Sequence, residues 1–276
     1  MKYVPIAETN DAKSKSYHKY IYGPMMEIRG NDEKQLLELR PDPSKALCFS
    51  DRSKIQTAEY NYEPEGIYIT KDSGIIVSGC IDVPDITKEM LDWFMIWHQL
   101  DPLRYAIWNP EDHYNVGLTQ KDRDRFLDES IPISERIWGT TSSVLESMNG
   151  EKPEPIDIHF NQPSELGFRD DLIGTEYCQS MVCSYSVNRV GLFRIPVTMA
   201  EVMRKGPKGT NVWVSHWWIG CGEENGKDIK KRIPGIAAKK VASLLVHNHK
   251  EVTHLNKILP KLYAEYGSKS LTAEIQ

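Results

Sequence analysis

The clearest periodic pattern in the chain lies near its C-terminal end. From residue 236 to residue 266, apolar residues recur every three or four positions, which predicts one long amphipathic helix. Pro234 and Gly235 precede this helix and Gly267 follows it, and Pro260 is expected to kink it because its ring clashes with the preceding turn. The face that must be buried carries Val241, Leu244, Leu255, Ile258, Leu259 and Leu262.

Segments with the alternating pattern of β-strands come before this helix. Two such segments flank the sequence KDSG at 71–74 and predict a β-hairpin. The turn sequences SVNRVG and RKGPKGTN separate the last three of the strand-like segments that follow, which are 104–108, 156–160, 177–187, 190–203 and 211–220. These turns favour an antiparallel meander.

A shorter helix is predicted over residues 88–100, with Asp85 or Thr87 as its N-cap. This helix places Leu91, Phe94, Met95 and His98 near one face. The charged segment 116–137 is either helix or loop.

Many antiparallel strands followed by one long helix predict an α+β fold in which a curved sheet grips the C-terminal helix and leaves a cavity between them. Residues 1–65 are rich in polar residues, proline and tyrosine and have weak periodicity. We expect them to form an arm or small subdomain on the main domain, which spans residues 66–276.

The composition narrows the possible partners. The chain has 276 residues, of which 40% are hydrophobic and 26% charged, and its net charge of −5 is spread along the sequence. Nucleic acid and anionic membrane are therefore poor partners. No secretory signal and no run of roughly 20 apolar residues is present, so we expect a soluble, cytoplasmic protein.

The cysteines give no sign of a metal site or a disulfide framework. The five of them are scattered without CxxC spacing, and we expect all to be packing thiols: Cys48, Cys80, Cys178, Cys183 and Cys221. Any metal must therefore be held by histidines and carboxylates.

Glu251 is the first candidate ligand, because it falls within the buried stripe of the long helix. His247 lies one turn earlier at the edge of the stripe, and residues four apart on a helix point the same way. A buried carboxylate is costly unless it is paired or bound to a metal, and zinc sites use such pairs. The alternative is that His247 and Glu251 bond each other or a buried arginine. His249 and His254 lie outside the stripe and are expected to be exposed.

The sequence RYAIWNPEDHYNV supplies further candidates. Its Asn-Pro-Glu turn delivers Asp112 and His113 to the end of the sheet, and Tyr105 lies eight residues before His113. An ordinary hydrogen-bonded turn is the alternative for Asp112 and His113. In a strand over 141–147, Glu146 shares a face with Ser142 and Val144, so it is either a buried carboxylate or a surface residue.

Three blocks resemble the 2,4-diacetylphloroglucinol hydrolases and the related phloretin hydrolases: RYAIWNPEDHYNV, GTTSSVLESMNG and VHNHKEVTHLNKILPKLYAEYG, with weaker support from WVSHWWIG. The resemblance covers about residues 85–267. It implies a Bet v 1-like helix-grip fold, a homodimer, and one zinc ion (Zn2+) bound by two histidines and two glutamates. The residues that match these ligands are His113, Glu146, His247 and Glu251.

The same resemblance implies a reaction. It predicts that zinc-activated water cleaves the carbon–carbon bond between an acyl group and a polyphenol ring, in a phenolic ketone such as phloretin or an acylphloroglucinol. Tyr105 matches a tyrosine that contacts substrate hydroxyls, and Asn115 matches an asparagine of the family, with Asp122 or Asp124 near its aspartate.

His216 is a candidate proton carrier and Trp217 a candidate for stacking on the ring. Ordinary packing in the sheet is the alternative for both residues. For the whole chain, the alternatives are a non-catalytic carrier of hydrophobic ligands with the same fold, or the same metal site acting on another diketone or an ester.

Overall fold

A single eight-stranded antiparallel sheet forms the body of the protein. The computed structural model describes residues 3–22, 30–70, 74–190, 193–233 and 238–274. The strand order is β1-β2-β8-β7-β6-β5-β4-β3, so the first two strands join the sheet through the pairing of β2 with β8, the last strand of the meander. The strands are β1 (Gly66–Thr70), β2 (Gly74–Asp82), β3 (His113–Leu118), β4 (Thr140–Glu146), β5 (Glu154–Phe160), β6 (Ser180–Val190), β7 (Phe193–Lys205) and β8 (Asn211–Ile219).

A separate two-stranded ribbon and a set of helices complete the fold. The ribbon is β9 (Cys221–Glu224) with β10 (Lys227–Lys230). The α-helices are α1 (Asn10–Ser14), α2 (Gly30–Glu38), α3 (Lys88–Trp97), α4 (Pro102–Trp108), α5 (Gln120–Leu127) and α6 (Ala238–Tyr266). Short 3-10 helices are η1 (Pro5–Glu8), η2 (Ser16–Tyr22), η3 (Pro43–Lys45), η4 (Phe49–Gln56), η5 (His98–Leu100), η6 (Ile133–Glu135), η7 (Pro163–Leu166) and η8 (Asp170–Leu172).

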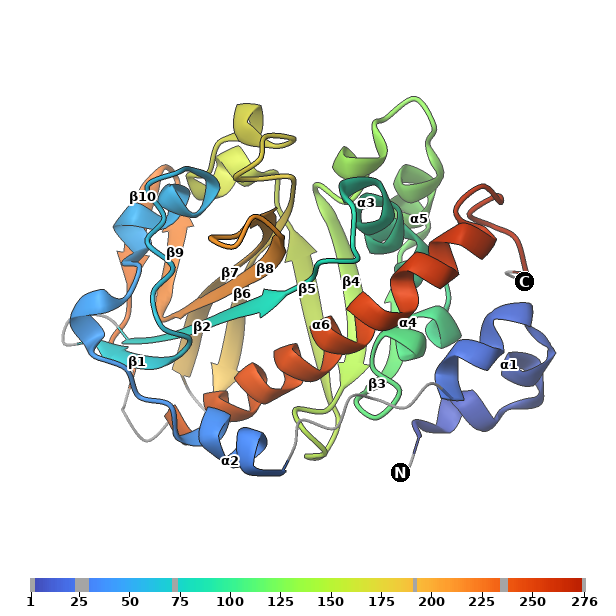
Figure 1. Cartoon of the computed structure of the whole chain (residues 1–276), viewed down its shortest axis with the longest axis horizontal. Helices are drawn as coiled ribbons and strands as arrows, with labels where there is room; N and C mark the ends of the chain where they lie inside the picture. Colours follow the sequence, from blue (N-terminus) through green and yellow to red (C-terminus); the bar gives the residue numbers. More distant parts are fainter. Residues whose placement is uncertain (1–2, 23–29, 71–73, 191–192, 234–237, 275–276) are drawn as a thin grey trace.

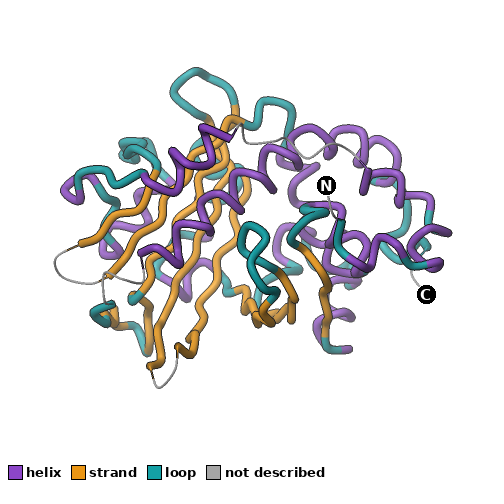
Figure 2. The backbone as a smooth tube through the Cα atoms, turned by 90° about the horizontal axis from the view of Figure 1, so that it is seen from below, coloured by secondary structure: helices purple, strands orange, loops and turns teal. Residues whose placement is uncertain are grey.

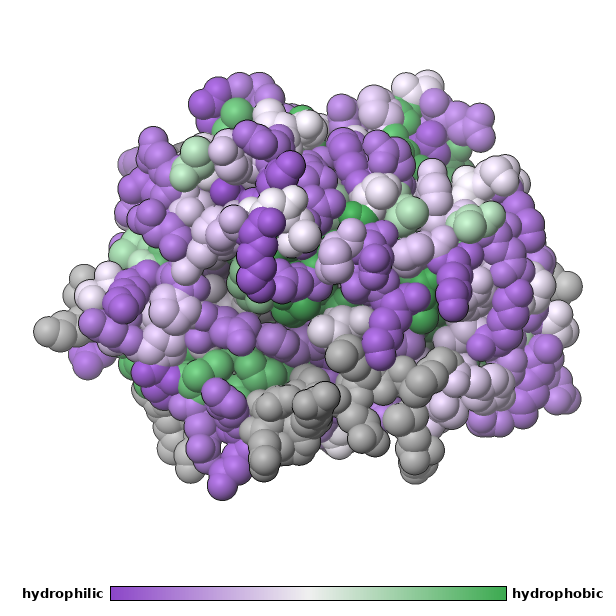
Figure 3. Space-filling view, viewed as in Figure 1, coloured by the Kyte–Doolittle hydropathy of each residue, from purple (hydrophilic) through white to green (hydrophobic). Residues whose placement is uncertain are grey.

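Helix α6 lies across one face of the curved sheet (Figures 1 and 2), which confirms the predicted α+β helix-grip arrangement. Its buried stripe packs on the sheet and on α3, and includes Leu255, Leu259 and Leu262. The helix continues through Pro260. Pro234 and Gly235, which are predicted to open it, lie outside the described residues. Figure 3 shows that the outer surface on this side is mostly hydrophilic, with hydrophobic groups in its recesses.

Both faces of the central strands are buried. On the face opposite α6, a second core joins Phe49 and Ile55 of η4 to Val214 and Trp218 of β8. The described part of residues 1–65 therefore lies on several sides of the sheet, because η1 and η2 pack beside α4 while η4 covers the opposite face. The domain boundary at residue 65 stays a prediction.

Several predicted elements need correction. Residues 104–108 form a helix instead of a strand, because Asp101 accepts hydrogen bonds from the backbone N–H groups of Leu103 and Arg104 and Pro102 starts the helix. The SVNRVG segment continues β6 as far as Val190 instead of forming a turn throughout. Thr87 is the cap of α3, and the segment 116–137 contains the end of β3, α5 and η6.

The remaining expectations concern cysteines and membranes. All five cysteines are free thiols. Every described helix is too short or too polar to span a bilayer.

Candidate metal centre

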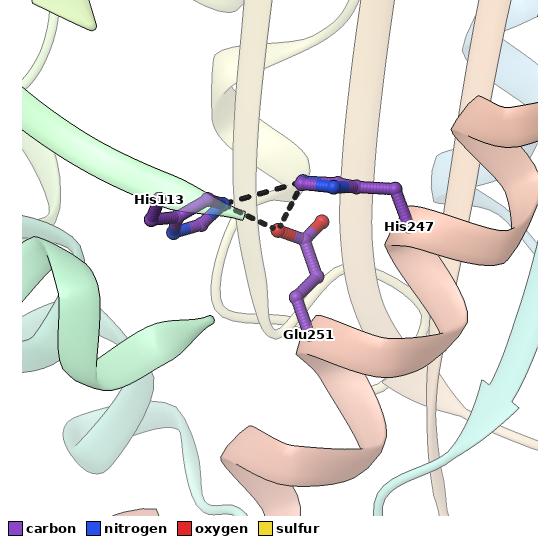
Figure 4. A group of neighbouring side chains, drawn as sticks. All are labelled: His113, His247 and Glu251. Carbon is purple, nitrogen blue, oxygen red and sulfur yellow. Dashed lines mark hydrogen bonds and ion pairs between the residues drawn. The ribbon is translucent and has the colours of Figure 1, made fainter. Parts of the chain in front are cut away.

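Two paired antiparallel strands and one helix bring the predicted ligands together. His113 is the first residue of β3 and lies directly opposite Glu146, the last residue of β4. His247 and Glu251 lie one turn apart on α6, and their side chains point at His113 (Figure 4). All four residues are buried, with exposed fractions between 1% and 8%.

The distances within this group match those between the ligands of a single ion. The Nε2 atoms of His113 and His247 are 3.2 Å apart, and each lies 3.4 Å from Oε2 of Glu251. Glu146 Oε2 lies 3.5 Å from Nε2 of His113. Ligands about 2.0–2.1 Å from a tetrahedral zinc stand roughly 3.3 Å from each other. His113, His247 and Glu251 therefore have the mutual spacing of ligands of a single ion, and their nitrogen and oxygen donors suit zinc. Glu146 lies outside this group of three and contacts it through His113.

Neighbouring groups orient both imidazoles. His113 Nδ1 lies 3.2 Å from the backbone oxygen of Tyr105, so this nitrogen carries the proton and Nε2 is left as a ligand atom. Asp112 Oδ2 lies 3.8 Å from Nδ1 of His247 on the side away from the centre. Asp112 is itself held by hydrogen bonds from the Ser147 hydroxyl and from the backbone N–H of Gly150. Carboxylates and carbonyls in these positions are typical of histidines that bind metals.

Tyr105 touches the centre from helix α4. Its ring stacks on the imidazole of His113 with centroids 4.2 Å apart and an angle of 7° between the planes. Its hydroxyl donates a hydrogen bond of 2.7 Å to Glu146 Oε2. Burial and the neighbouring Glu146 carboxylate raise the pKa of Tyr105 well above its usual value, so the phenol keeps its proton and remains a donor.

Glu251 and His247 stabilise each other's charged forms at the centre. Burial opposes ionisation of Glu251, but the two histidines outweigh it and lower the pKa of Glu251 to about 2. Burial likewise opposes charge on His247, yet Glu251 and Asp112 raise its pKa well above its usual value. In the described part of the chain, the ion pairs of Glu146 and Glu251 are with histidines alone. A metal cation would replace the proton that these carboxylates stabilise on imidazole.

A fourth buried carboxyl group lies next to this centre and was missed in the sequence. Glu201 of β7 is 6% exposed and accepts a hydrogen bond of 3.4 Å from Nδ2 of Asn248, which also reaches Oε1 of Glu251 at 3.3 Å. Burial raises the pKa of Glu201 to about 8. A glutamate inside the apolar run VTMAEVM was the feature that could have revealed it.

The structure does not bring His216 to the centre. His216 lies on the opposite face of the sheet, where its Nε2 bonds Glu63 of the N-terminal region and its ring stacks on Trp218. Successive strand residues point to opposite faces, so the hydroxyl of its neighbour Ser215 reaches Glu201 instead. The prediction that His216 carries protons for the reaction is therefore wrong.

Other predicted contacts also lie elsewhere. Asn115 is exposed, because the β3 strand has an irregularity after His113 and Asn115 pairs with the outward-facing Leu145. The prediction that Asn115 contacts the substrate is therefore corrected. Asp122 caps the start of α5 with Thr119, and Asp124 is exposed. Trp217 does face α6, within the apolar cluster around Leu245 and Val77.

Two histidines of α6 behave differently from each other. His249 is partly buried and bonds Glu65 through a 2.8 Å contact. His254 is 1% exposed, so its predicted exposure is wrong. Helix α6 packs against α4 as well as against the sheet, and this second contact buries a side outside the predicted stripe.

The sequence comparisons agree with this geometry. The family model described as the DAPG hydrolase PhiG domain matches residues 47–264. The chain belongs to this family. It is 31% identical to a phloretin hydrolase of Eubacterium ramulus over 95% of this chain and 94% of that protein. It is 29% identical to a 2,4-diacetylphloroglucinol hydrolase of a Pseudomonas species over 67% of this chain and 65% of that protein. The recognition of this family from three sequence blocks, and with it the expectation of an enzyme, is thereby confirmed.

Solved structures of low sequence identity share a more limited likeness. Ara h 8.0201 aligns with 67% of this chain and 97% of its own, at a TM-score of 0.37 and 11% identity. A START superfamily protein from Mycobacterium smegmatis aligns with 69% of this chain and 97% of its own, at a TM-score of 0.36 and 12% identity.

Proposed function

We propose that this DAPG hydrolase family member is a zinc-dependent hydrolase that cleaves the carbon–carbon bond between an acyl group and a polyphenol ring. The proposed zinc ligands are His113, Glu146, His247 and Glu251. The proposed substrates are phenolic ketones such as phloretin or an acylated phloroglucinol, in keeping with the names of its relatives. The proposed products are a carboxylic acid and the deacylated polyphenol.

One observation carries the metal assignment. Three buried donor groups from β3 and α6, His113, His247 and Glu251, converge with spacings of 3.2–3.4 Å, although unpaired buried carboxylates are costly. Hydrogen bonding among the four residues alone would leave two carboxylates to share the protons of two imidazoles. A divalent cation satisfies His113, His247 and Glu251 at once, which favours a metal over a purely structural network, and the proposal adds Glu146 as the fourth ligand.

The metal, when bound, would supply an activated water near neutral pH and polarise the acyl carbonyl. The protein residues have separate tasks. Glu146 and Glu251 offset the charge of the cation, while Asp112 and the Tyr105 carbonyl hold the imidazoles with Nε2 toward it. The burial of the whole group excludes bulk water and strengthens its electrostatic interactions.

Tyr105 remains our candidate for contact with a ring hydroxyl. Its phenolic oxygen donates to Glu146, and a phenol oxygen is also an acceptor. A substrate hydroxyl therefore has a hydrogen-bond partner in Tyr105 without breaking the existing bond. Trp217 stays a proposed contact for the ring, since it faces the helix side of the sheet.

The experiment is metal analysis of the purified full chain, followed by assays of phloretin and acylphloroglucinol loss with and without a chelator. We expect stoichiometric zinc, formation of a carboxylic acid, loss of activity on chelation, and recovery when zinc is returned. Metal-free protein that retains full activity would contradict the zinc assignment.

The same assays separate the alternatives. A carrier of hydrophobic ligands would bind phloretin without turnover and would need no metal. Activity on another diketone or on esters, with none on phenolic ketones, would keep the metal site but change the substrate class. A measurement of the molecular mass in solution tests the proposed homodimer.

A further inference from the structure

The proposed cleavage needs a proton at the ring carbon that loses its acyl group. That carbon leaves with the electron pair of the broken bond, and a carbon leaving group of this kind needs an acid within reach. The histidine predicted for proton transfer, His216, faces away from the metal centre toward Glu63. The donor must therefore come from another residue on the α6 side of the sheet.

Glu201 occupies that side, at the middle of the sheet. It pairs with Ser215 of β8 across one edge of its strand and with Val182 of β6 across the other. Ser215 in turn pairs with Gly79 of β2. A Cβ atom at Gly79 would stand 3.0 Å from Oδ1 of Asn248, so the absence of a side chain there lets α6 bring this amide down to the sheet.

Asn248 links Glu201 to the metal centre. Its Nδ2 atom lies 3.4 Å from Glu201 Oε1 and 3.3 Å from Glu251 Oε1, so one amide group spans the two carboxyl groups. Glu201 therefore stands one side chain away from a proposed zinc ligand, within the same buried region. Its other hydrogen-bond partner is the hydroxyl of Ser215, at 3.4 Å.

A small cavity adjoins Glu201. It has a volume of about 10 Å³, which is room for roughly one water molecule. Its walls include Met95 of α3, Met203 of β7 and Trp213 of β8, with the Ser180 hydroxyl as a second polar group. Methionine side chains repack readily around a ligand, and a tryptophan face suits a planar ring. The cavity is too small for a phenol ring as it stands, so a ring could reach Glu201 here only if these side chains repack.

We propose that Glu201 is the catalytic acid of this site, which donates its proton to the ring carbon as the acyl group leaves. This inference rests on the proposed function and adds the residue that meets the ring. The state of Glu201 agrees with it, since burial and the neighbouring Glu251 carboxylate raise the pKa of Glu201 and favour the protonated carboxyl group, against the opposing effect of the Ser215 hydrogen bond.

The step balances with water as the single co-reactant. The hydroxide part of water forms a bond to the acyl carbon, and the bond between that carbon and the ring breaks. The electron pair of the broken bond takes the Glu201 proton and becomes the new ring C–H bond. The remaining proton of the water restores Glu201. The net result is one carboxylic acid and one deacylated ring.

The test compares Glu201→Gln with wild type as full-length, zinc-quantified protein. Glutamine has the same shape and keeps a hydrogen-bond acceptor, but it has no proton to donate. We expect unchanged zinc content and circular dichroism, little change in KM for phloretin, and a fall in kcat of at least about 100-fold. Hydrolysis of phenyl acetate should stay near the wild-type rate, because its oxygen leaving group needs no proton at carbon.

The matched control is Glu63→Gln, which makes the same change at a buried glutamate on the opposite face of the sheet. It should retain kcat for phloretin. If Glu201→Gln does not fold, Glu201→Asp serves instead, because it keeps the acid but withdraws it by one methylene. We expect that variant to hold zinc with a reduced kcat, and full turnover would overturn the proposal.

Three results would overturn the role of Glu201 while leaving the proposed function intact. They are a Glu201→Gln variant with wild-type kcat on phloretin, a variant that loses its zinc, and a variant that loses ketone and ester hydrolysis equally. The last two would make Glu201 a support for the metal centre instead of an acid. Wild-type protein without activity on any phenolic ketone would remove the proposed function and this inference together.

Discussion

The Nε2 atoms of His113 and His247 lie 3.2 Å apart, although 134 residues separate them in the chain. The Nδ1 atom of each ring faces a different acceptor, the Tyr105 carbonyl for one and the Asp112 carboxylate for the other. If the proton of each ring is on Nδ1, the two imidazoles present two lone pairs to the same point. This relationship suits the proposed metal site, and it underlies the predictions that follow.

Removal of either helix ligand is expected to abolish zinc retention. In His247→Ala or Glu251→Ala, the remaining groups no longer enclose the ion, and the lost donor cannot be replaced from the buried surroundings. Mass spectrometry of the metal content after dialysis measures the effect. His249→Ala is the matched control, because His249 lies on the same helix but bonds Glu65. A Glu251→Ala variant with full zinc content would refute the ligand assignment.

Asp112→Asn should weaken zinc binding without removing it. The amide has no negative charge to stabilise the Nδ1 proton of His247, and changes of this kind cost about 10–100-fold in metal affinity. Competition with a chromogenic chelator measures the dissociation constant. Asp122→Asn is the control, since Asp122 is also buried but its carboxylate accepts from the hydroxyl of Thr119, the N-cap of helix α5. Equal zinc affinity in wild type and Asp112→Asn would show that Asp112 does not orient His247.

Tyr105→Phe should lower turnover more than it lowers zinc content. The phenyl ring keeps the stack on His113, whereas the hydroxyl that bonds Glu146 and the proposed ring hydroxyl is lost. A hydrogen bond to a charged group contributes enough to predict a fall of about 10–100-fold in kcat/KM. Tyr185→Phe is the control, because its hydroxyl also bonds a glutamate but on the outer part of the sheet. Loss of zinc in Tyr105→Phe would make Tyr105 a support of the metal centre alone.

The sequence predicted the parts of the site that depend on one clear periodicity. The candidate ligands on α6 were proposed because a carboxylate stands out in a long apolar stripe. The alternation of β4 left Glu146 either buried or exposed, and only the family resemblance selected it; the structure buries it. The register between β3 and β4, which sets His113 opposite Glu146, depends on pairing that no single strand encodes.

The errors have three physical causes. Strand β8 is buried on both faces, so apolar and polar residues do not alternate from Val212 to Ile219. The sequence therefore did not predict which face of the sheet His216 lies on. Glu201 escaped notice for the same reason. The placement of Tyr105 in a strand overlooked Asp101 and Pro102, whose order is typical of a helix start. His254 is buried where α6 packs against α4, and a helical wheel with one buried stripe does not predict that second contact.

The burial of His254 predicts a pH dependence of stability that His254→Leu should reduce. Burial lowers the pKa of His254 to about 4 in the folded protein, below the value of about 6.5 for an exposed histidine. Between these pH values the unfolded chain binds more protons at this residue than the folded one, so stability is lost as the pH falls through that window. The full difference in the pKa of His254 between the folded and unfolded chain corresponds to about 3 kcal/mol of unfolding free energy.

Urea unfolding of metal-free protein at pH 7 and at pH 4.5 measures this contribution. Wild type should lose more unfolding free energy than His254→Leu, because both proteins share the other titrating groups and differ at this one ring. The use of metal-free protein keeps zinc release out of the comparison. Equal losses in the two proteins would mean that His254 titrates normally and that acid opens the contact between α6 and α4 before the protein unfolds.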